Sequence, residues 1–508
     1  MKIYHHLLDN NKRFFIIFYF LITIYYFFNC FLLNDYEILF MDERLIVDDI
    51  YNVWLLDDTF NRFTNIDNSI LKNLLILLTE FSYGGDLRYG RLWSNIFTLI
   101  VGPLTYISDH VVISGVRILN LTILNLSFYL LSKSFIEKKY FWMSLVAFYS
   151  LPGVEFLILI PKPDVFALLS TALGLFYFQK DKIFLSIFFL SVATFLKFNF
   201  LIILVFFLLH FFLRAQNKIN FTLKTTFLAY LSLLVVNPIL LVPPIKFLNL
   251  QLPNFYQKYF EWILSQGSYG QQQLISIDFF KNWLKTISNF YLLPTSINFI
   301  IFMIFILFLI SLTNKIYKSE EVTPKLFLII FYFYMFFYMF FIERQFIWYI
   351  TVPILFLTIT VFRNNIDLKR KLDKIFSFNL ILFLILGNLS NIQNHYENKS
   401  FQANYKLGYQ EIDNKDSAIN LVNEIVKQIE IIYREEVSKD KNIVYWNPNL
   451  FIPRNKVTYS SHFEVREYWG SENLEKILIE ADFYVTNTDL YLDNVNKIKI
   501  NNFYIFFD

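Results

Sequence analysis

Long apolar runs recur along most of the chain, and they limit its fold more than any other feature. Hydrophobic residues make up 56% of the 508 residues, and the chain contains 62 phenylalanines and 33 tyrosines. A soluble domain is about 45–50% apolar, and a helix needs about 20 apolar residues to cross a bilayer. The sequence therefore predicts a polytopic α-helical membrane protein.

The apolar runs predict about eleven transmembrane helices. Some runs are shorter than about 20 residues, and those on either side of Lys197 fit bent or interrupted helices. A further run, 92–107, contains Gly102-Pro103 and is predicted to be interfacial or re-entrant. The predicted spans are 14–33, 111–131, 140–158, 165–179, 183–196, 198–213, 224–243, 293–313, 326–342, 346–362 and 375–390.

Lysine and arginine are distributed unevenly between the two sets of segments that connect these spans. The short turns of one set contain only Lys162, Lys197 and Arg344. Short cytoplasmic loops carry the excess of positive charge, so the pattern predicts a cytoplasmic N-terminus and a C-terminus outside the cell or in the periplasm. The basic residues form no single patch, which argues against nucleic acid as a partner. The other set contains 19 basic residues, namely Lys2, Lys12, Arg13, Lys133, Lys138, Lys139, Lys180, Lys182, Arg214, Lys218, Lys224, Lys315, Lys318, Lys325, Arg363, Lys369, Arg370, Lys371 and Lys374.

Three segments on the predicted outer face are too long to be simple connections. Loop 34–93 has a net charge of −6 and loop 244–292 a net charge of +2. The tail 391–508 alternates helical and strand patterns, so it is predicted to be a small extracytoplasmic α/β domain that follows a transmembrane domain, 1–390. Its predicted helices are 417–436 and 474–481, and its predicted strands are 442–446, 457–460, 482–485 and 502–507.

Charged residues at the predicted outer ends of the spans are the candidates for chemistry. Asp42-Glu43 follows the first span, where a carboxylate can act as a general base toward a hydroxyl beside the membrane. The neighbouring pair Asp48-Asp49 is a competing candidate, and a solvated acidic loop is the simplest alternative.

Three further sites lie at other predicted outer turns. Lys162-Pro163-Asp164 begins a span, and a helix N-terminal cap is the alternative to a role in binding. Lys197 lies between two apolar runs with no acidic neighbour in the sequence, so its charge is costly unless an anion meets it. For Arg344, followed by Tyr349, a salt-bridged turn with interfacial aromatics is favoured over a role in binding.

In their order and on their common predicted face, these residues resemble the polytopic GT-C glycosyltransferases. The resemblance covers about residues 10–390 and is closest to the bacterial protein-mannosyltransferase-like and aminoarabinose-transferase-like branch. It rests on Asp42-Glu43, Lys162-Pro163-Asp164, Lys197-Phe198-Asn199, Asn237-Pro238 and an Arg344 turn that leads into Trp348-Tyr349. The family implies an inner-membrane enzyme that transfers a sugar, with inversion, from a polyprenyl-phosphate donor to a lipid, glycan or protein acceptor.

The resemblance also implies roles for individual residues. Asp42 becomes the general base, Glu43 orients it or binds acceptor or metal, and Asp164 becomes a second acid. Lys197 and, more weakly, Arg344 become ligands of the donor phosphate. The further residues proposed to bind substrate are Lys162, Asn199 and Tyr349. Arg88 is proposed separately from the resemblance, as one of the charged residues of segment 81–91 that would line an acceptor groove; the alternative is a structured loop that packs on the outer membrane surface.

Two features leave other interpretations open. Ile46 stands where the family often has an aromatic residue, and the glycine-rich segment 81–91, which contains Asp86, Arg88 and Arg91, has no counterpart in the family. The sequence identifies no cofactor. A divalent metal stays an open alternative because metal dependence varies across the family, although no histidine or cysteine ligand cluster in the sequence demands one. The alternative function is a transporter or flippase for a polyprenyl-linked glycan, although no internal repeat supports transport. A structural membrane subunit is a third alternative.

Overall fold

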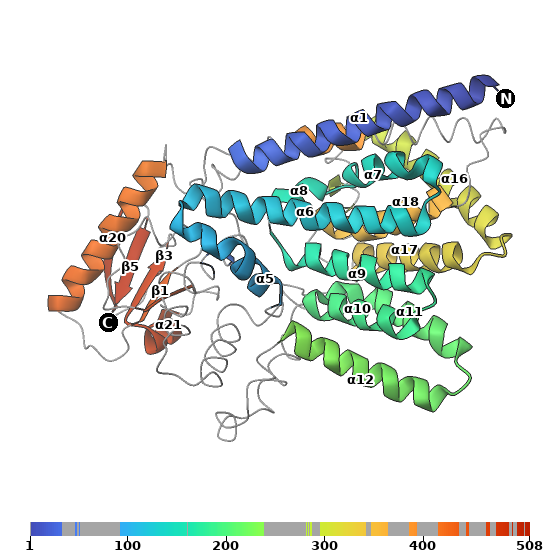
Figure 1. Ribbon diagram of the computed structural model, residues 1–508. Coiled ribbons are helices and arrows are strands. Elements are labelled where there is room, and N and C mark those ends of the chain that lie inside the picture. The colour runs from blue at the N-terminus through green and yellow to red at the C-terminus, as the bar shows by residue number, and fades with distance from the viewer. Residues whose placement is uncertain are drawn as a thin grey trace. The chain divides into compact units, whose positions relative to one another are not determined.

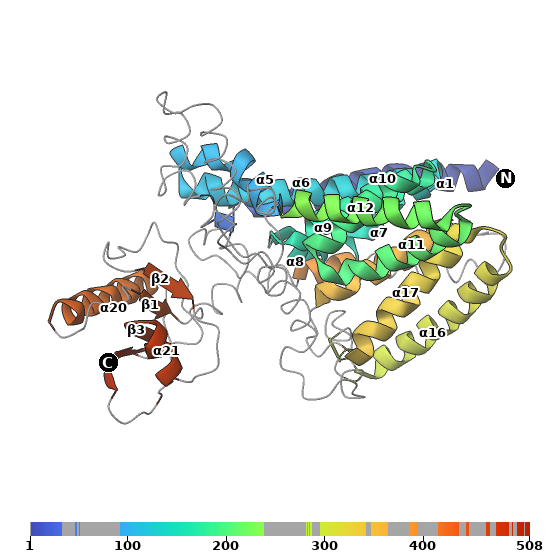
Figure 2. The ribbon, with the colours of Figure 1, turned by 90° about the horizontal axis from the view of Figure 1, so that it is seen from below.

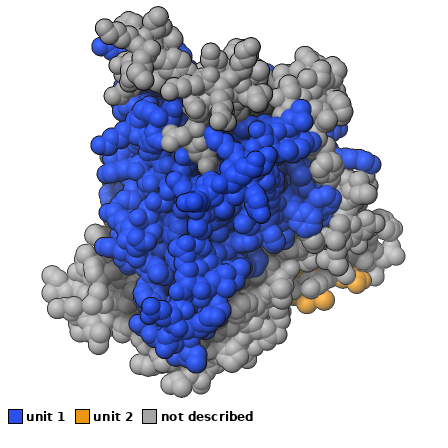
Figure 3. Space-filling view, turned by 90° about the vertical axis from the view of Figure 1, so that its right-hand side faces the viewer, with its two compact units in different colours: residues 1–32, 45–395 blue, residues 33–44, 396–508 orange. Residues whose placement is uncertain are grey.

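The computed structural model describes residues 2–32, 46–47, 50, 92–159, 161–237, 281, 283, 285–286, 295–341, 347–363, 386–393, 415–435, 443–446, 464–467, 474–486, 490, 495–501 and 503–507. The chain divides into two compact units, coloured in Figure 3. Unit 1 comprises Met1–Leu32 and Leu45–His395, and unit 2 comprises Leu33–Arg44 and Tyr396–Asp508.

Unit 1 is a helical bundle (Figures 1 and 2). Helix α9 packs against both α6 and α10, α10 packs against α12, and α17 packs against α18. Helix α1 lies along α6 and α7. The helices are α1 (Lys2–Leu32), α5 (Leu92–Val101), α6 (Asp109–Phe135), α7 (Phe141–Tyr149), α8 (Val154–Leu159), α9 (Pro163–Gln179), α10 (Ile183–Leu196), α11 (Leu201–Arg214), α12 (Lys218–Val236), α16 (Thr295–Tyr317), α17 (Val322–Phe341) and α18 (Thr351–Arg363), with 3-10 turns η3 (Gly102–Tyr106), η4 (Lys138–Tyr140), η5 (Phe198–Phe200) and η7 (Ile347–Ile350).

The surface of these helices is apolar. On α1, Phe20, Leu21 and Phe28 are each at least half exposed, which is costly in water and favourable in lipid. Among the described residues, four helices are long and apolar enough to cross a membrane: Arg13–Phe31, His110–Phe135, Lys218–Val236 and Val322–Phe340. Unit 1 is therefore a membrane-associated helical bundle, whereas a count of about eleven spans stays a prediction.

The predicted span 140–158 is not one continuous helix. Helix α7 ends at Tyr149 and α8 begins at Val154, so this prediction is wrong. Pro152 has no backbone N–H to continue the helix, and Gly153 adopts a positive φ of 81°, which glycine tolerates better than other residues. The interruption leaves backbone carbonyls without intrahelical partners inside an apolar bundle.

Polar side chains from other helices bind these carbonyls. The Asn391 Nδ2 donates to the carbonyl oxygens of Tyr149 (2.7 Å) and Leu151 (3.0 Å), and the Thr351 hydroxyl donates to that of Pro152 (2.6 Å). Residues 386–393, which include Asn391, are helical and pack so closely on this turn that a Cβ on Gly387 would lie 2.9 Å from the Ser150 Cβ. Such a break in a membrane helix is stable only where protein groups satisfy its backbone.

Segment 92–107 forms two short pieces, α5 and η3, before the N-cap residue Ser108 starts α6. The Ser108 hydroxyl accepts a hydrogen bond from the Val111 backbone N–H at 3.4 Å. Helix α5 and η3 both pack against α6. Whether the segment is interfacial or re-entrant stays a prediction.

Unit 2 contains a five-stranded sheet with strand order β2-β1-β3-β5-β4. Strands β1, β2 and β3 are parallel, while β5 pairs antiparallel with both β3 and β4. The elements are α20 (Lys415–Glu435), β1 (Ile443–Trp446), β2 (Glu464–Glu467), α21 (Leu474–Glu480), β3 (Phe483–Thr486), β4 (Asn496–Ile500) and β5 (Phe503–Phe507).

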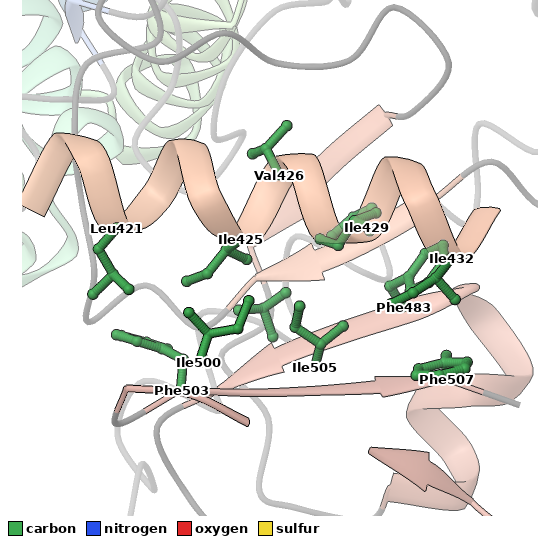
Figure 4. Packing of buried hydrophobic residues seen from close by; sticks show 12 residues of the cluster. Leu421, Ile425, Val426, Ile429, Ile432, Phe483, Ile500, Phe503, Ile505 and Phe507 are labelled. Atoms are coloured by element: carbon green, nitrogen blue, oxygen red, sulfur yellow. The ribbon is translucent and has the colours of Figure 1, made fainter. Parts of the chain in front are cut away.

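Side chains alternate between the two faces of this sheet. Phe483 and Val485 pack in the core that includes residues of α20 (Figure 4), whereas Tyr484 packs in a second core with residues of α21. The alternation is the period of two that a strand buried on both faces requires. The predicted helices agree with α20 and α21, and three predicted strands agree with β1, β3 and β5. Predicted strand 457–460 lies outside the described residues, and the pattern did not predict β2 or β4.

Candidate functional site

Lys197 and Asp164 form a buried ion pair at one end of the bundle. Helix α9 starts at Pro163 and its packing partner α10 ends at Leu196, and the two charged residues occupy these neighbouring helix ends. The Lys197 Nζ lies 3.2 Å from the Asp164 Oδ2, and the two side chains are 15% and 9% exposed. The structure therefore brings together two residues that lie at the ends of separate predicted spans.

Local sequence places each member of the pair. Pro163 occupies the first position of α9, where its missing N–H costs nothing, and Asp164 in the same turn has a favourable interaction with the helix N-terminus. Lys197 ends α10 with extended backbone (φ −151°), and its N–H donates to the Ala193 carbonyl oxygen at 2.9 Å. The Lys197 carbonyl oxygen then accepts from the Phe200 N–H in η5.

Asp164 is the anion that meets the Lys197 ammonium in the structure. No acid is close to Lys197 in sequence, but the fold supplies one from 33 positions earlier. Asp164 is also buried, so it is not a solvated charge at the helix end. Its Oδ2 is the atom that contacts the Lys197 Nζ, so the carboxylate is paired inside the bundle.

Asn199 joins this pair to a group of aromatic residues. Its Nδ2 donates to the Tyr338 hydroxyl at 2.9 Å, and its backbone carbonyl oxygen accepts from the Tyr334 hydroxyl at 2.7 Å. Tyr338 stacks with Tyr349, at 5.8 Å between ring centroids, and the charges of Lys197 and Asp164 both act on its hydroxyl. We call Asp164, Lys197, Asn199, Tyr338 and Tyr349 the Lys197 cluster.

Sequence reasoning missed Tyr334, Tyr338 and Trp283. Trp283 is fully buried and stacks with Tyr338, with 6.1 Å between the ring centroids. Tyr334 and Tyr338 lie four residues apart on α17, the spacing that places two side chains on one helix face. That spacing was visible, but a chain in which 20% of residues are aromatic offers many such pairs.

Lys162 is the second cation near the start of α9. Its side chain is buried, with 4% of the residue exposed, and its backbone is extended at the N-cap position. Its carbonyl oxygen accepts from the Val165 N–H at 3.2 Å, which fixes the position of the residue relative to Asp164. Two lysines and one aspartate are therefore held within or beside the first turn of α9.

The remaining predicted site residues lie outside the described part of the chain. They are Asp42, Glu43, Arg88 and Arg344, together with the competing pair Asp48-Asp49 and the loop residues Asp86 and Arg91. Their roles stay predictions. Among the residues that the structure describes, no three histidine, cysteine, aspartate or glutamate side chains are grouped to hold a metal ion.

No protein-family model matches the sequence, and no characterised protein or solved structure matches it either. Buried ammonium groups and an amide N–H are donors suited to an anion, and phosphate is the anion that lysine commonly binds in proteins.

Proposed function

We propose that the protein is an integral membrane glycosyltransferase that moves a sugar, with inversion, from a polyprenyl-phosphate donor to a lipid, glycan or protein acceptor. The buried Lys197–Asp164 pair is the observation that supports this proposal most. An ammonium group without an anionic partner is costly in an apolar bundle. The Asp164 carboxylate is the partner of the Lys197 ammonium here, and an incoming phosphate can take the place of that carboxylate.

The lengths of the helices favour a phosphate that arrives on a lipid. Helices α10 and α11 have 14 residues each, so each rises about 21 Å, whereas the hydrocarbon core is about 30 Å thick. Lys180 and Lys182 flank the start of α10, where we place one membrane surface. Lys197, at the other end of α10, then lies about 9 Å short of the opposite hydrocarbon boundary. A lipid-linked phosphate reaches that depth more readily than a water-soluble one.

One buried acceptor atom in the Lys197 cluster suits a sugar. The Asn199 Oδ1 accepts no hydrogen bond in the structure, whereas the Asp164 Oδ2 is paired with the Lys197 Nζ. A buried acceptor without a donor is unfavourable, and a sugar hydroxyl group is a donor that would satisfy it. The cluster thus combines cations for a phosphate with an acceptor for a hydroxyl group.

The reaction needs a base in addition to this binding site, and Asp42 is the proposed one, with Glu43 orienting it. In the transfer, the acceptor hydroxyl oxygen forms a bond to the anomeric carbon while the bond from that carbon to the phosphate oxygen breaks. The hydroxyl proton passes to the Asp42 carboxylate, and the lysines stabilise the negative charge on the departing phosphate.

The proposed topology places the site outside the cytoplasm of a bacterial inner membrane. About eleven spans, a cytoplasmic N-terminus and an extracytoplasmic unit 2 follow from the distribution of basic residues. A reporter enzyme fused after Asp508 tests this arrangement. We expect activity only for a reporter that functions outside the cytoplasm, and activity of a cytoplasmic reporter would reverse the proposed orientation.

Binding of farnesyl phosphate, a short polyprenyl phosphate, tests the role of the Lys197 cluster. We expect Lys197→Ala to weaken binding about 10-fold or more, since a hydrogen bond to a charged group contributes about 1.5–3 kcal/mol, while Lys197→Arg retains part of it. Farnesol, which lacks the phosphate, should bind equally to both variants and to the unchanged protein. Lys139→Ala is the matched control, because Lys139 is half exposed and pairs with Glu137 at the η4 turn.

Equal binding of farnesyl phosphate by the unchanged protein and Lys197→Ala would contradict the phosphate site.

Substitution of the proposed base separates transfer from transport. Asp42→Asn should abolish the glycosylated product, followed by mass in cells, yet leave farnesyl phosphate binding unchanged. Undiminished product in both Asp42→Asn and Asp48→Asn would favour the flippase alternative.

A further inference from the structure

Glu155 is a second buried acid in unit 1, separate from the Lys197 cluster. It lies in the short helix α8 and has no solvent exposure. Neither carboxyl oxygen has a hydrogen-bond partner, and none of the ion pairs between described residues includes it. A carboxyl group that forms no hydrogen bond or ion pair with another described residue does not hold the fold together.

Contacts along α6 and α1 place α8 well inside the apolar part of the bundle. Phe31 contacts His110 with 5.4 Å between ring centroids, so the end of the apolar stretch of α1 lies level with the start of α6. Asn120 follows His110 by ten residues, or about 15 Å of helix, and its Nδ2 donates to the Ile158 carbonyl oxygen at 3.2 Å. Helix α8 therefore lies about half a hydrocarbon thickness below that level.

The titratable and charged groups around α8 do not neutralise a carboxylate. Tyr26 of α1 is close enough to interact electrostatically with Glu155, and it stacks on Tyr149 at the end of α7. Helix α6 contributes Arg117, one turn from Asn120, and η7 contributes Tyr349. Arg117 is buried and has contacts of its own, but it forms no ion pair with Glu155.

We infer that Glu155 is a proton-binding site, occupied by a neutral carboxylic acid while the bundle is closed. A carboxylate at this depth without a cation or hydrogen-bond donor is strongly disfavoured, so the proton stays on the group until the surroundings open to water. Opening lets the carboxyl group release its proton, and closing requires a proton to be taken up again. The inference does not depend on the proposed glycosyltransferase activity.

A hydrophobic carbodiimide tests this assignment on the full-length protein in native membranes. The acid proton moves to a nitrogen of dicyclohexylcarbodiimide, and the carboxyl oxygen bonds to the central carbon. The adduct rearranges to a stable N-acylurea, so the peptide gains the whole mass of the reagent. We expect an adduct on Glu155, found by peptide mass spectrometry, whose yield falls as the pH of the membrane suspension is raised.

Glu137 is the matched control on the same protein. Its carboxylate is 42% exposed and pairs with Lys139 at 2.8 Å. We expect a water-soluble carbodiimide with an added amine to modify Glu137 but not Glu155, and the hydrophobic reagent to do the reverse. Absence of the hydrophobic adduct from Glu155 at every pH, or an adduct yield that does not change with pH, would overturn the inference.

Substitution separates a proton site from a charged side chain. Glu155→Gln replaces a neutral group with a neutral group of the same shape, so the melting temperature of the detergent-solubilised protein should not change, while the adduct disappears. Glu155→Lys should lower the melting temperature, because it places a cation without a partner at the same position. A fall with Glu155→Gln as large as that with Glu155→Lys would show that the carboxyl is ionised and paired, against the inference.

Discussion

Units 1 and 2 arrange polar and apolar side chains in opposite ways. Unit 1 exposes Phe20 and Leu21 to its surroundings and buries the acids Glu155 and Asp164. Unit 2 buries Phe483 and Ile505 between sheet and helix, as a water-soluble domain does. Apolar residues are thus buried in unit 2 but exposed on unit 1. Burial of an apolar group stabilises a fold only where the group would otherwise be in contact with water.

The contrast also concerns backbone hydrogen bonds. In unit 2 the backbone N–H and C=O groups of each strand bond to neighbouring strands, and β1 lies between two parallel neighbours. In unit 1 the broken segment between α7 and α8 depends on side chains such as Asn391 and Thr351. Polar residues inside the apolar bundle are therefore required for the fold, and those without a partner become candidates for function.

The largest effect is expected when the buried ion pair loses one member. Lys197→Met leaves Asp164 as an unpaired buried charge and should lower stability by about 3–5 kcal/mol. Asp164→Asn combined with Lys197→Met should recover most of this loss, because no buried charge remains. Thermal unfolding in detergent of the unchanged protein, the two single variants Lys197→Met and Asp164→Asn, and the double variant measures the coupling. Additive effects of the two changes would show that the pair does not interact.

Replacement of an exposed apolar residue by arginine should have a much larger effect in unit 1 than in unit 2. Leu21 on α1 is 58% exposed and Ile479 on α21 is 72% exposed. Leu21→Arg should cost about 2.5–3.5 kcal/mol of membrane insertion, whereas Ile479→Arg should change stability by about 0.5 kcal/mol or less. The yield of monodisperse full-length protein from membranes compares them, and equal yields would refute the claim that lipid covers α1.

Sequence patterns predicted what depends on neighbouring residues along the chain. The membrane class, most helix positions in unit 1 and the helices of unit 2 follow from composition and periodicity. The break between α7 and α8 was not predicted, although Pro152-Gly153 marks it, because the apolar run continues through both residues. A break there is stable only because distant residues such as Asn391 bind the freed carbonyls.

The candidate site shows the same division. Lys162, Asp164 and Lys197 were predicted individually from their unusual positions at span ends, and Asn199 from the family resemblance. Their pairing was not, because Asp164 meets Lys197 only after α9 and α10 fold against each other. Tyr338 was not predicted either, since nothing in the sequence distinguishes it from the other aromatic residues of α17.

The smallest effect is expected for the exposed ion pair between Arg363 and Glu321. The Arg363 Nε lies 3.0 Å from the Glu321 Oε2, shorter than the Lys197–Asp164 contact, but the side chains are 23% and 58% exposed. Solvent screens exposed pairs, so Glu321→Ala should cost about 1 kcal/mol or less, and added salt should reduce even that.

Comparison of the two pairs then isolates the contribution of burial. Arg363 also lies over the Phe135 ring, 5.8 Å from its centroid, so Glu321→Ala is the cleaner substitution of the two partners. If Glu321→Ala lowered the melting temperature as much as Lys197→Met, the short distance would explain both effects and burial neither. We expect the larger fall in melting temperature for Lys197→Met, although the Lys197–Asp164 contact is the longer of the two. That result would mean that desolvation, and not the distance between the charges, determines how strongly the stability of unit 1 depends on each pair.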